Sequence, residues 1–133
     1  MKGVVMKAGA RKIRILHVDD EKDTLEVVKV ILEREGFEVV SVNLGKTALH
    51  QIKLDGFDLI ILDIMMPDMS GWELFSKLGD VKKKYKVIFL SILELTEDKL
   101  AELKKSGIVD YIRKPFDRDY FVSRVRKAIA ENR

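Results

Sequence analysis

The feature that most limits the fold of this chain is Leu59-Ile60-Ile61-Leu62, four consecutive apolar residues that end at Asp63. A strand with one face in water alternates apolar and polar residues, whereas a parallel strand covered on both faces is apolar throughout. The segment 87–90 is also apolar throughout, and 13–18 is short and rich in apolar, β-branched residues around Arg14 and His17. The sequence therefore predicts a parallel β-sheet that is buried between two layers of helices.

Segments with apolar residues at helical spacing separate these runs, and glycines such as Gly36 and Gly107 are expected to end helices. The predicted strands are 13–18, 37–42, 59–62, 87–90 and 108–112. The predicted helices include 25–32, 48–52, 72–78, 95–106 and 117–132. Five strands that alternate with five helices indicate an α/β fold, a doubly wound five-stranded parallel sheet flanked by five helices.

Length and composition exclude several classes of protein. The chain has 133 residues, which suits one domain, and we divide it into a basic N-terminal extension, 1–12, and a domain, 13–133. No apolar run approaches the roughly 20 residues of a bilayer span, and there is no signal peptide, so we expect a cytoplasmic protein without membrane contact. The absence of cysteine excludes thiol chemistry. The net charge of +3 is spread along the chain, apart from a basic run at 82–86, and predicts no direct contact with nucleic acid.

Polar side chains follow four of the predicted strands. Asp19 and Asp20 follow the first strand, Asp63 the third, Ser91 the fourth and Lys114 the fifth. In an open parallel sheet, the carboxyl ends of the strands form the edge where ligands bind. Three carboxylates, a hydroxyl and an ammonium group should therefore meet at one edge of the sheet.

These groups suit phosphoryl transfer. Three clustered carboxylates repel one another unless a cation lies among them, and their oxygens suit Mg²⁺. Lys114 and Ser91 can bind phosphoryl oxygens, and the Asp63 carboxylate can act as the nucleophile. Taken singly, each residue has an ordinary explanation, such as a helix cap for Asp20. The coincidence of all five at successive strand ends favours a site.

The same residues resemble the response-regulator receiver family of two-component signalling, including its stand-alone chemotaxis receivers. The resemblance runs from about Ile13 to Ile129. It is carried by Asp19-Asp20, by Asp63-Ile64-Met65-Met66-Pro67-Asp68-Met69-Ser70-Gly71, by Ser91 and by Tyr111-Ile112-Arg113-Lys114-Pro115-Phe116.

The resemblance implies a flavodoxin-like sheet with the strand order 2-1-3-4-5. It also implies that Asp63 accepts a phosphoryl group from a histidine kinase in a Mg²⁺-dependent reaction, which changes the affinity for a downstream protein. Asp19, Asp20, Asp63 and the backbone carbonyl of Met65 would hold the metal.

Further roles follow from the same resemblance. Ser91 and Tyr111 would form a switch pair, and the peptide bond before Pro115 would be cis. Asp110 and Arg124 would lie on the face that responds to the switch. There they could pair across a dimer formed by an otherwise monomeric protein on phosphorylation.

The sequence departs from the family pattern at Ile92 and Ile108, where small residues are usual. Ile92 should narrow the mouth of the site. Met65 and Leu93, also apolar, should border the path of an attacking water, which predicts slow loss of the phosphoryl group.

Alternative functions stay open at this point. We expect a stand-alone regulator that is not a turnover enzyme, but a phosphorelay intermediate or a receiver from a longer DNA-binding regulator would share the pattern. A Mg²⁺-dependent phosphohydrolase typically needs a second aspartate two residues after its nucleophile, where this chain has Met65. A flavin-binding domain would need a loop rich in Ser, Thr and Gly after the first strand, where this chain is acidic.

Overall fold

Strand β3 (Leu59–Leu62), the apolar run, is the central strand of a five-stranded parallel sheet with the order β2-β1-β3-β4-β5. The computed structural model describes residues 12–54, 56–79 and 85–131. Along the chain, the other elements are β1 (Arg14–Val18), α1 (Lys22–Arg34), β2 (Glu38–Val42), α2 (Gly45–Leu54), α3 (Gly71–Lys77), β4 (Lys86–Ser91), α4 (Glu97–Ser106), β5 (Asp110–Arg113) and α5 (Arg118–Ala130). The predicted doubly wound fold and its strand order are confirmed.

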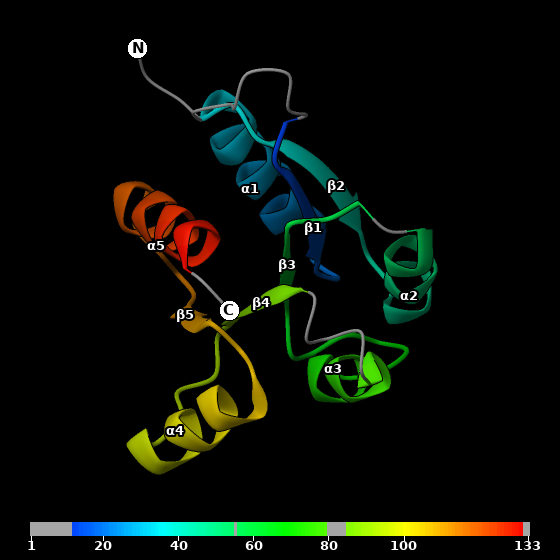
Figure 1. Ribbon diagram of the computed structural model, residues 1–133, viewed down its shortest axis with the longest axis vertical. Helices are drawn as coiled ribbons and strands as arrows, with labels where there is room; N and C mark the ends of the chain where they lie inside the picture. The colour runs from blue at the N-terminus through cyan, green and yellow to red at the C-terminus, as the bar shows by residue number, and fades with distance from the viewer. Residues whose placement is uncertain (1–11, 55, 80–84, 132–133) are drawn as a thin grey trace.

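Two apolar cores lie on opposite faces of the sheet, because successive side chains of a strand point to opposite sides. On β3, Ile60 and Leu62 belong to one core, whereas Leu59 and Ile61 belong to the other. The first core also holds apolar residues of α2, α3 and α4, and the second holds those of α1 and α5. Figure 1 shows α1 and α5 on one side of the sheet and α2 and α3 on the other.

Two elements begin two residues later than predicted, each for a local reason. Helix α4 begins at Glu97, not at residue 95, because Thr96 caps it by accepting a hydrogen bond from the Lys99 N–H. Strand β5 begins at Asp110, not at residue 108. Gly107 has a φ of 116° and ends α4, and the N–H of Ile108 donates to the Leu103 carbonyl at 3.3 Å. Ile108 is therefore part of a helix end and is buried in the core.

The loop between β3 and α3 is held close to the end of β3. The N–H of Gly71 donates to the Ile64 carbonyl at 2.7 Å. A Cβ atom on Gly71 would lie 2.4 Å from the Asp63 carbonyl oxygen, so only glycine allows this approach. The predicted extension, apart from Lys12, and Lys82, Lys83 and Lys84 of the basic run lie outside the described residues.

Candidate metal centre and active site

The register of the sheet brings the predicted site residues together. Val18 is paired with Leu62, so Asp19 and Asp63 follow at the same level. The N–H of Asp63 donates to the Val18 carbonyl at 2.9 Å, and that of Lys114 donates to the Ser91 carbonyl at 2.8 Å. Residues far apart in the sequence are thus fixed at one edge of the sheet by backbone hydrogen bonds.

The three aspartates form a compact cluster. One carboxylate oxygen from each of Asp19, Asp20 and Asp63 lies within 4.8 Å of the others. Asp19 and Asp63 are buried and Asp20 is exposed, so the cluster opens to solvent on one side. Carboxylate oxygens at this spacing suit a hard cation that keeps several waters, as Mg²⁺ does. The donor set therefore fits Mg²⁺, and the role of the Met65 carbonyl stays a prediction.

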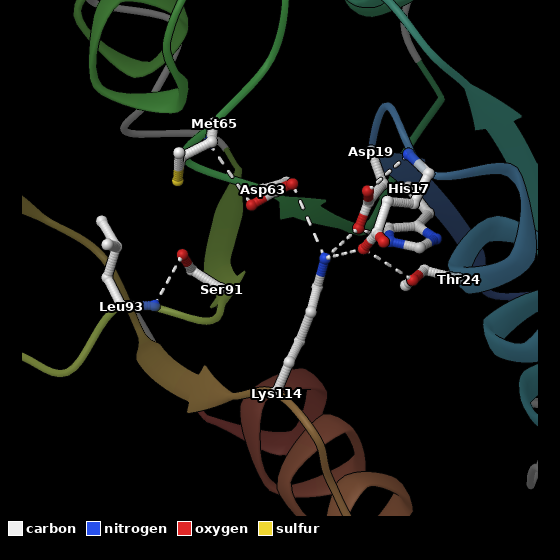
Figure 2. A network of polar contacts seen from close by, with 9 residues as sticks. His17, Asp19, Thr24, Asp63, Met65, Ser91, Leu93 and Lys114 are labelled. Carbon is white, nitrogen blue, oxygen red and sulfur yellow. Dashed lines mark hydrogen bonds and ion pairs between the residues drawn. The ribbon is translucent and has the colours of Figure 1, made fainter.

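Lys114 contacts three acidic residues, and Figure 2 shows its ammonium group approaching Asp19 and Asp63. Its Nζ lies 2.8 Å from Oδ2 of Asp19, 3.3 Å from Oε1 of Glu21 and 3.6 Å from Oδ2 of Asp63. Burial lowers the pKa of Lys114, but the hydrogen bond to Asp19 and the charges of Asp19 and Asp63 outweigh it and raise the pKa overall. Lys114 is therefore a fixed cation beside Asp63.

The environment of Asp63 disfavours the charged form of its carboxylate. Burial, and then the charge of Asp19, raise the pKa of Asp63 to about 6, although Lys114 and backbone N–H groups act in the opposite direction. One of these N–H groups belongs to Met65, which lies 3.3 Å from Oδ1. A bound divalent cation would offset this repulsion, which is a second reason why the site fits one.

Ser91 and Tyr111, the predicted switch pair, meet through the segment after β4. Ser91 is fully buried, and its Oγ accepts a hydrogen bond from the Leu93 N–H at 3.2 Å. The Tyr111 hydroxyl donates to the Leu93 carbonyl. Burial raises the pKa of Tyr111, and hydrogen bonding with Ser91 opposes this rise. In Figure 2, Ser91 and Leu93 lie on one side of Asp63, and His17 and Asp19 lie on the other.

Two residues of the site were not predicted from the sequence. Glu21 contacts Lys114, and the acidic run 19–21 is a signal that could have indicated this. His17 is fully buried on β1, with Nε2 3.8 Å from Oδ2 of Asp19. Burial, and then the charge of Lys114, lower the pKa of His17 to about 3, so the imidazole is neutral. Its place two residues before Asp19 was the available signal.

A pocket of about 420 Å³ lies beside Lys114 and is lined by both apolar and polar residues, the acidic Glu21 and Asp23 among them. Its lining includes Thr24, Val27, Ile92, Lys114, Pro115 and Phe116. Ile92 lines this pocket and is 59% exposed. That it narrows the mouth of the site stays a prediction. The peptide bond between Lys114 and Pro115 is cis, as the resemblance implied.

Asp110 and Arg124 pair with each other inside one chain. Nε of Arg124 donates to Oδ2 of Asp110 at 2.6 Å, and a second guanidinium nitrogen donates to Oδ1. Asp110 is buried at the start of β5, and Arg124 comes from α5. Pairing across a dimer stays a prediction, and such a dimer would have to exchange these bonds.

Comparisons with known proteins agree with this fold. Residues 15–126 match the family described as the response regulator receiver domain. The chain is similar to the response regulator SaeR of Staphylococcus epidermidis, with 36% identity over 87% of this chain and 50% of the relative. The chain thus spans about half the length of the curated relatives it matches.

Two solved structures are similar over most of their length. The non-phosphorylated HemR receiver domain from Leptospira biflexa has a TM-score of 0.82 and 28% identity, covering 92% of this chain and 98% of its own. The response regulator TrrA from Thermotoga maritima, solved in complex with Mg²⁺-BeF, has a TM-score of 0.75 and 34% identity, covering 87% and 98%. Separately, none of the helices in the described part of the chain is long and apolar enough to cross a membrane.

Proposed function

The chain belongs to the response regulator receiver domain family, and from this premise we propose that it is a phosphoacceptor switch. In this proposal Asp63 accepts a phosphoryl group from a histidine kinase in a Mg²⁺-dependent reaction, and phosphorylation changes the affinity for a downstream effector protein. The chain would act as a carrier of the phosphoryl group and not as a turnover enzyme.

The observation that carries the proposal is the position of Asp63. Its buried carboxylate belongs to the cluster of three aspartates, and the Lys114 ammonium lies 3.6 Å from its Oδ2. A nucleophilic carboxylate needs positive charge close by, because the incoming phosphoryl oxygens carry negative charge. Lys114 supplies that charge from its position beside Asp63.

The residues of the chain have separate tasks in this scheme. The Met65 N–H orients Oδ1 of Asp63, and Lys114 moves from Asp19 towards the phosphoryl oxygens. The Ser91 hydroxyl would donate a hydrogen bond to one of these oxygens, which would draw the 91–93 segment and Tyr111 with it. Asp19, Asp20 and Asp63 would hold Mg²⁺, which when bound neutralises charge on the phosphoryl group.

Mass spectrometry tests the proposal directly. The protein is incubated with acetyl phosphate and Mg²⁺, and we expect one phosphoryl adduct on Asp63 that is lost in base. The variant Asp63→Asn and a sample with EDTA should show no adduct. Transfer from a phosphorylated histidine kinase should give the same adduct.

An adduct on a serine or histidine, or equal labelling of Asp63→Asn, would contradict the proposal. A phosphohydrolase is distinguished in the same experiment, because it would release inorganic phosphate over many turnovers. The exposed, apolar Met65 side chain offers no acid or base for such turnover.

A further inference from the structure

His17 is a buried polar side chain that the proposed reaction does not use. It is fully buried on β1, and neither ring nitrogen has a hydrogen-bond partner among the residues that the structure describes. Burying an imidazole without hydrogen bonds costs free energy, since its nitrogens lose their water. An apolar residue at this position would avoid that cost, so the imidazole needs an explanation.

The imidazole of His17 lies beside the carboxylate of Asp19, with Nε2 3.8 Å from Oδ2. Among the described residues, this oxygen contacts two nitrogens, Nζ of Lys114 at 2.8 Å and Nε2 of His17 at 3.8 Å. The contact with Lys114 is a strong charge-assisted hydrogen bond, whereas the contact with His17 is too long for a hydrogen bond. Figure 2 shows His17 beside Asp19, with the Lys114 ammonium approaching the same carboxylate.

The bond between Lys114 and Asp19 should not survive phosphorylation. A phosphoryl group on Asp63 brings about two negative charges and three acceptor oxygens. The Lys114 ammonium is already 3.6 Å from Asp63, so it can turn to these oxygens with a small movement. The buried Oδ2 of Asp19 then loses its close donor, while Oδ1 keeps the Glu21 N–H at 2.9 Å.

We propose that His17 is a positioning residue that donates a hydrogen bond from Nε2 to Oδ2 of Asp19 when Lys114 leaves that carboxylate. An approach of about 1 Å would bring the two atoms to hydrogen-bond distance. The imidazole stays neutral throughout, with its proton on Nε2. By holding the orientation of Asp19, it would preserve the metal site in the phosphorylated state, because hydrogen bonds to a ligating carboxylate orient it. This role in the phosphorylated state rests on the proposed function.

Nuclear magnetic resonance of the histidine rings tests the proposal. The chain has two histidines, and His50 is exposed on α2, so it serves as an internal reference. On addition of Mg²⁺ and beryllofluoride, a phosphoryl analogue, we expect the Nε2 proton of His17 to shift downfield and to exchange more slowly with water. The resonances of His50 should not move.

The variant Lys114→Met provides an arm that does not depend on phosphorylation. Without the ammonium, His17 should show the hydrogen-bonded signal in the metal-free protein, with no beryllofluoride present. Unchanged His17 signals in this variant would overturn the inference, whether or not Asp63 accepts a phosphoryl group. A wild type that fails to bind beryllofluoride would count against the proposed function alone.

Two variants of His17 separate hydrogen bonding from packing. His17→Leu fills the space without a donor, and His17→Gln keeps a donor in its amide. We expect the affinity for Mg²⁺ with beryllofluoride, followed by Trp72 fluorescence, to fall about 10- to 100-fold in the leucine variant and less in the glutamine variant. Equal affinity in all three folded proteins, checked by circular dichroism, would also overturn the inference.

Discussion

Lys114 and Asp63 show that the charges at this site are only partly balanced. The ammonium of Lys114 is shared by three carboxylates, and Asp19 holds it most closely. Lys114 therefore offsets only part of the effect of burial and of Asp19 on Asp63, and the pKa of Asp63 is raised to about 6. The resting site is therefore electrostatically strained, which is common at functional sites.

The strained carboxylate predicts how stability depends on pH. Since the pKa of Asp63 is higher in the folded protein, the native state binds a proton more tightly than the unfolded chain between pH 4 and 6. The contribution of this group to stability therefore falls as the pH rises through about 6. In EDTA, Asp63→Asn should be more stable than wild type, by on the order of 2 kcal/mol at pH 7.5 and by progressively less towards pH 4.

Urea unfolding of both proteins across this pH range measures the difference. Comparing the two at each pH cancels the titration of other groups. A stability difference that is constant with pH would contradict the assignment of the strain to Asp63.

The lifetime of the phosphorylated state should depend on the apolar rim of the site. Met65 is 54% exposed and Ile92 59%, whereas Leu93 is partly buried and packs against the core that holds Ile60 and Leu62. None of these three side chains can hydrogen-bond an in-line water, and loss of positioning can cost about 100-fold in rate. We expect a lifetime of many minutes, shortened in Met65→Asn and Leu93→Glu. Ile92→Ala should take up small phosphodonors faster.

Loss of label from the phosphorylated protein measures these rates. Val27→Ala is a suitable control, because Val27 lines the same pocket as Ile92 but comes from α1. If none of the rim variants decays faster than wild type, the rim does not control the lifetime.

At the scale of elements, a side-chain pair fixes α5 against β5. Arg124 makes two bonds to the buried Asp110, and its guanidinium also lies 5.3 Å from the centre of the Tyr120 ring. Loss of the cation would leave a buried carboxylate without its counter-charge, which is strongly destabilising. A second pair, Arg113 and Glu94, is exposed and 3.7 Å apart, and such surface pairs contribute little.

The comparison of these two pairs gives a prediction. We expect Arg124→Ala to lower the free energy of unfolding by about 2 kcal/mol, since Arg124 is itself partly exposed. The matched variant Arg113→Ala should lower it by less than about 0.5 kcal/mol. Thermal and urea unfolding of the three proteins decides this. Similar losses of unfolding free energy in both variants would mean that the burial of Asp110 does not determine how much stability is lost with its partner.

Elements were predictable from the sequence where one apolar pattern determined them. The run 59–62 identified β3 because both faces of that strand are buried, and Gly36 and Gly107 marked helix ends because both adopt positive φ. The start of α4 depended instead on which hydroxyl capped it, and Thr96 could not be distinguished from its neighbours by periodicity. His17 was missed because its place two residues before Asp19 does not by itself show that the imidazole will contact that carboxylate.

For the whole molecule, the acidic cluster should link metal binding to folding. A ligand that binds only the folded state stabilises it, by about 1.4 kcal/mol at ten times its dissociation constant. We expect Mg²⁺ to raise the melting temperature of wild type, and to raise that of Asp63→Asn less. Thermal melts in EDTA and in Mg²⁺, with ionic strength matched by KCl, check this. Equal melts in both conditions for wild type would argue against a metal site.

The site draws its residues from four strand ends, and Asp19 and Lys114 are 95 positions apart in the sequence. No short stretch of the chain holds enough of these groups to attract a metal and a phosphoryl donor together. A chain that is still incomplete on the ribosome, or one that has been cleaved or misfolded, should therefore accept no phosphoryl group. Only a protein with an intact sheet could be phosphorylated, so the need for the complete fold would prevent signalling by incomplete or damaged chains.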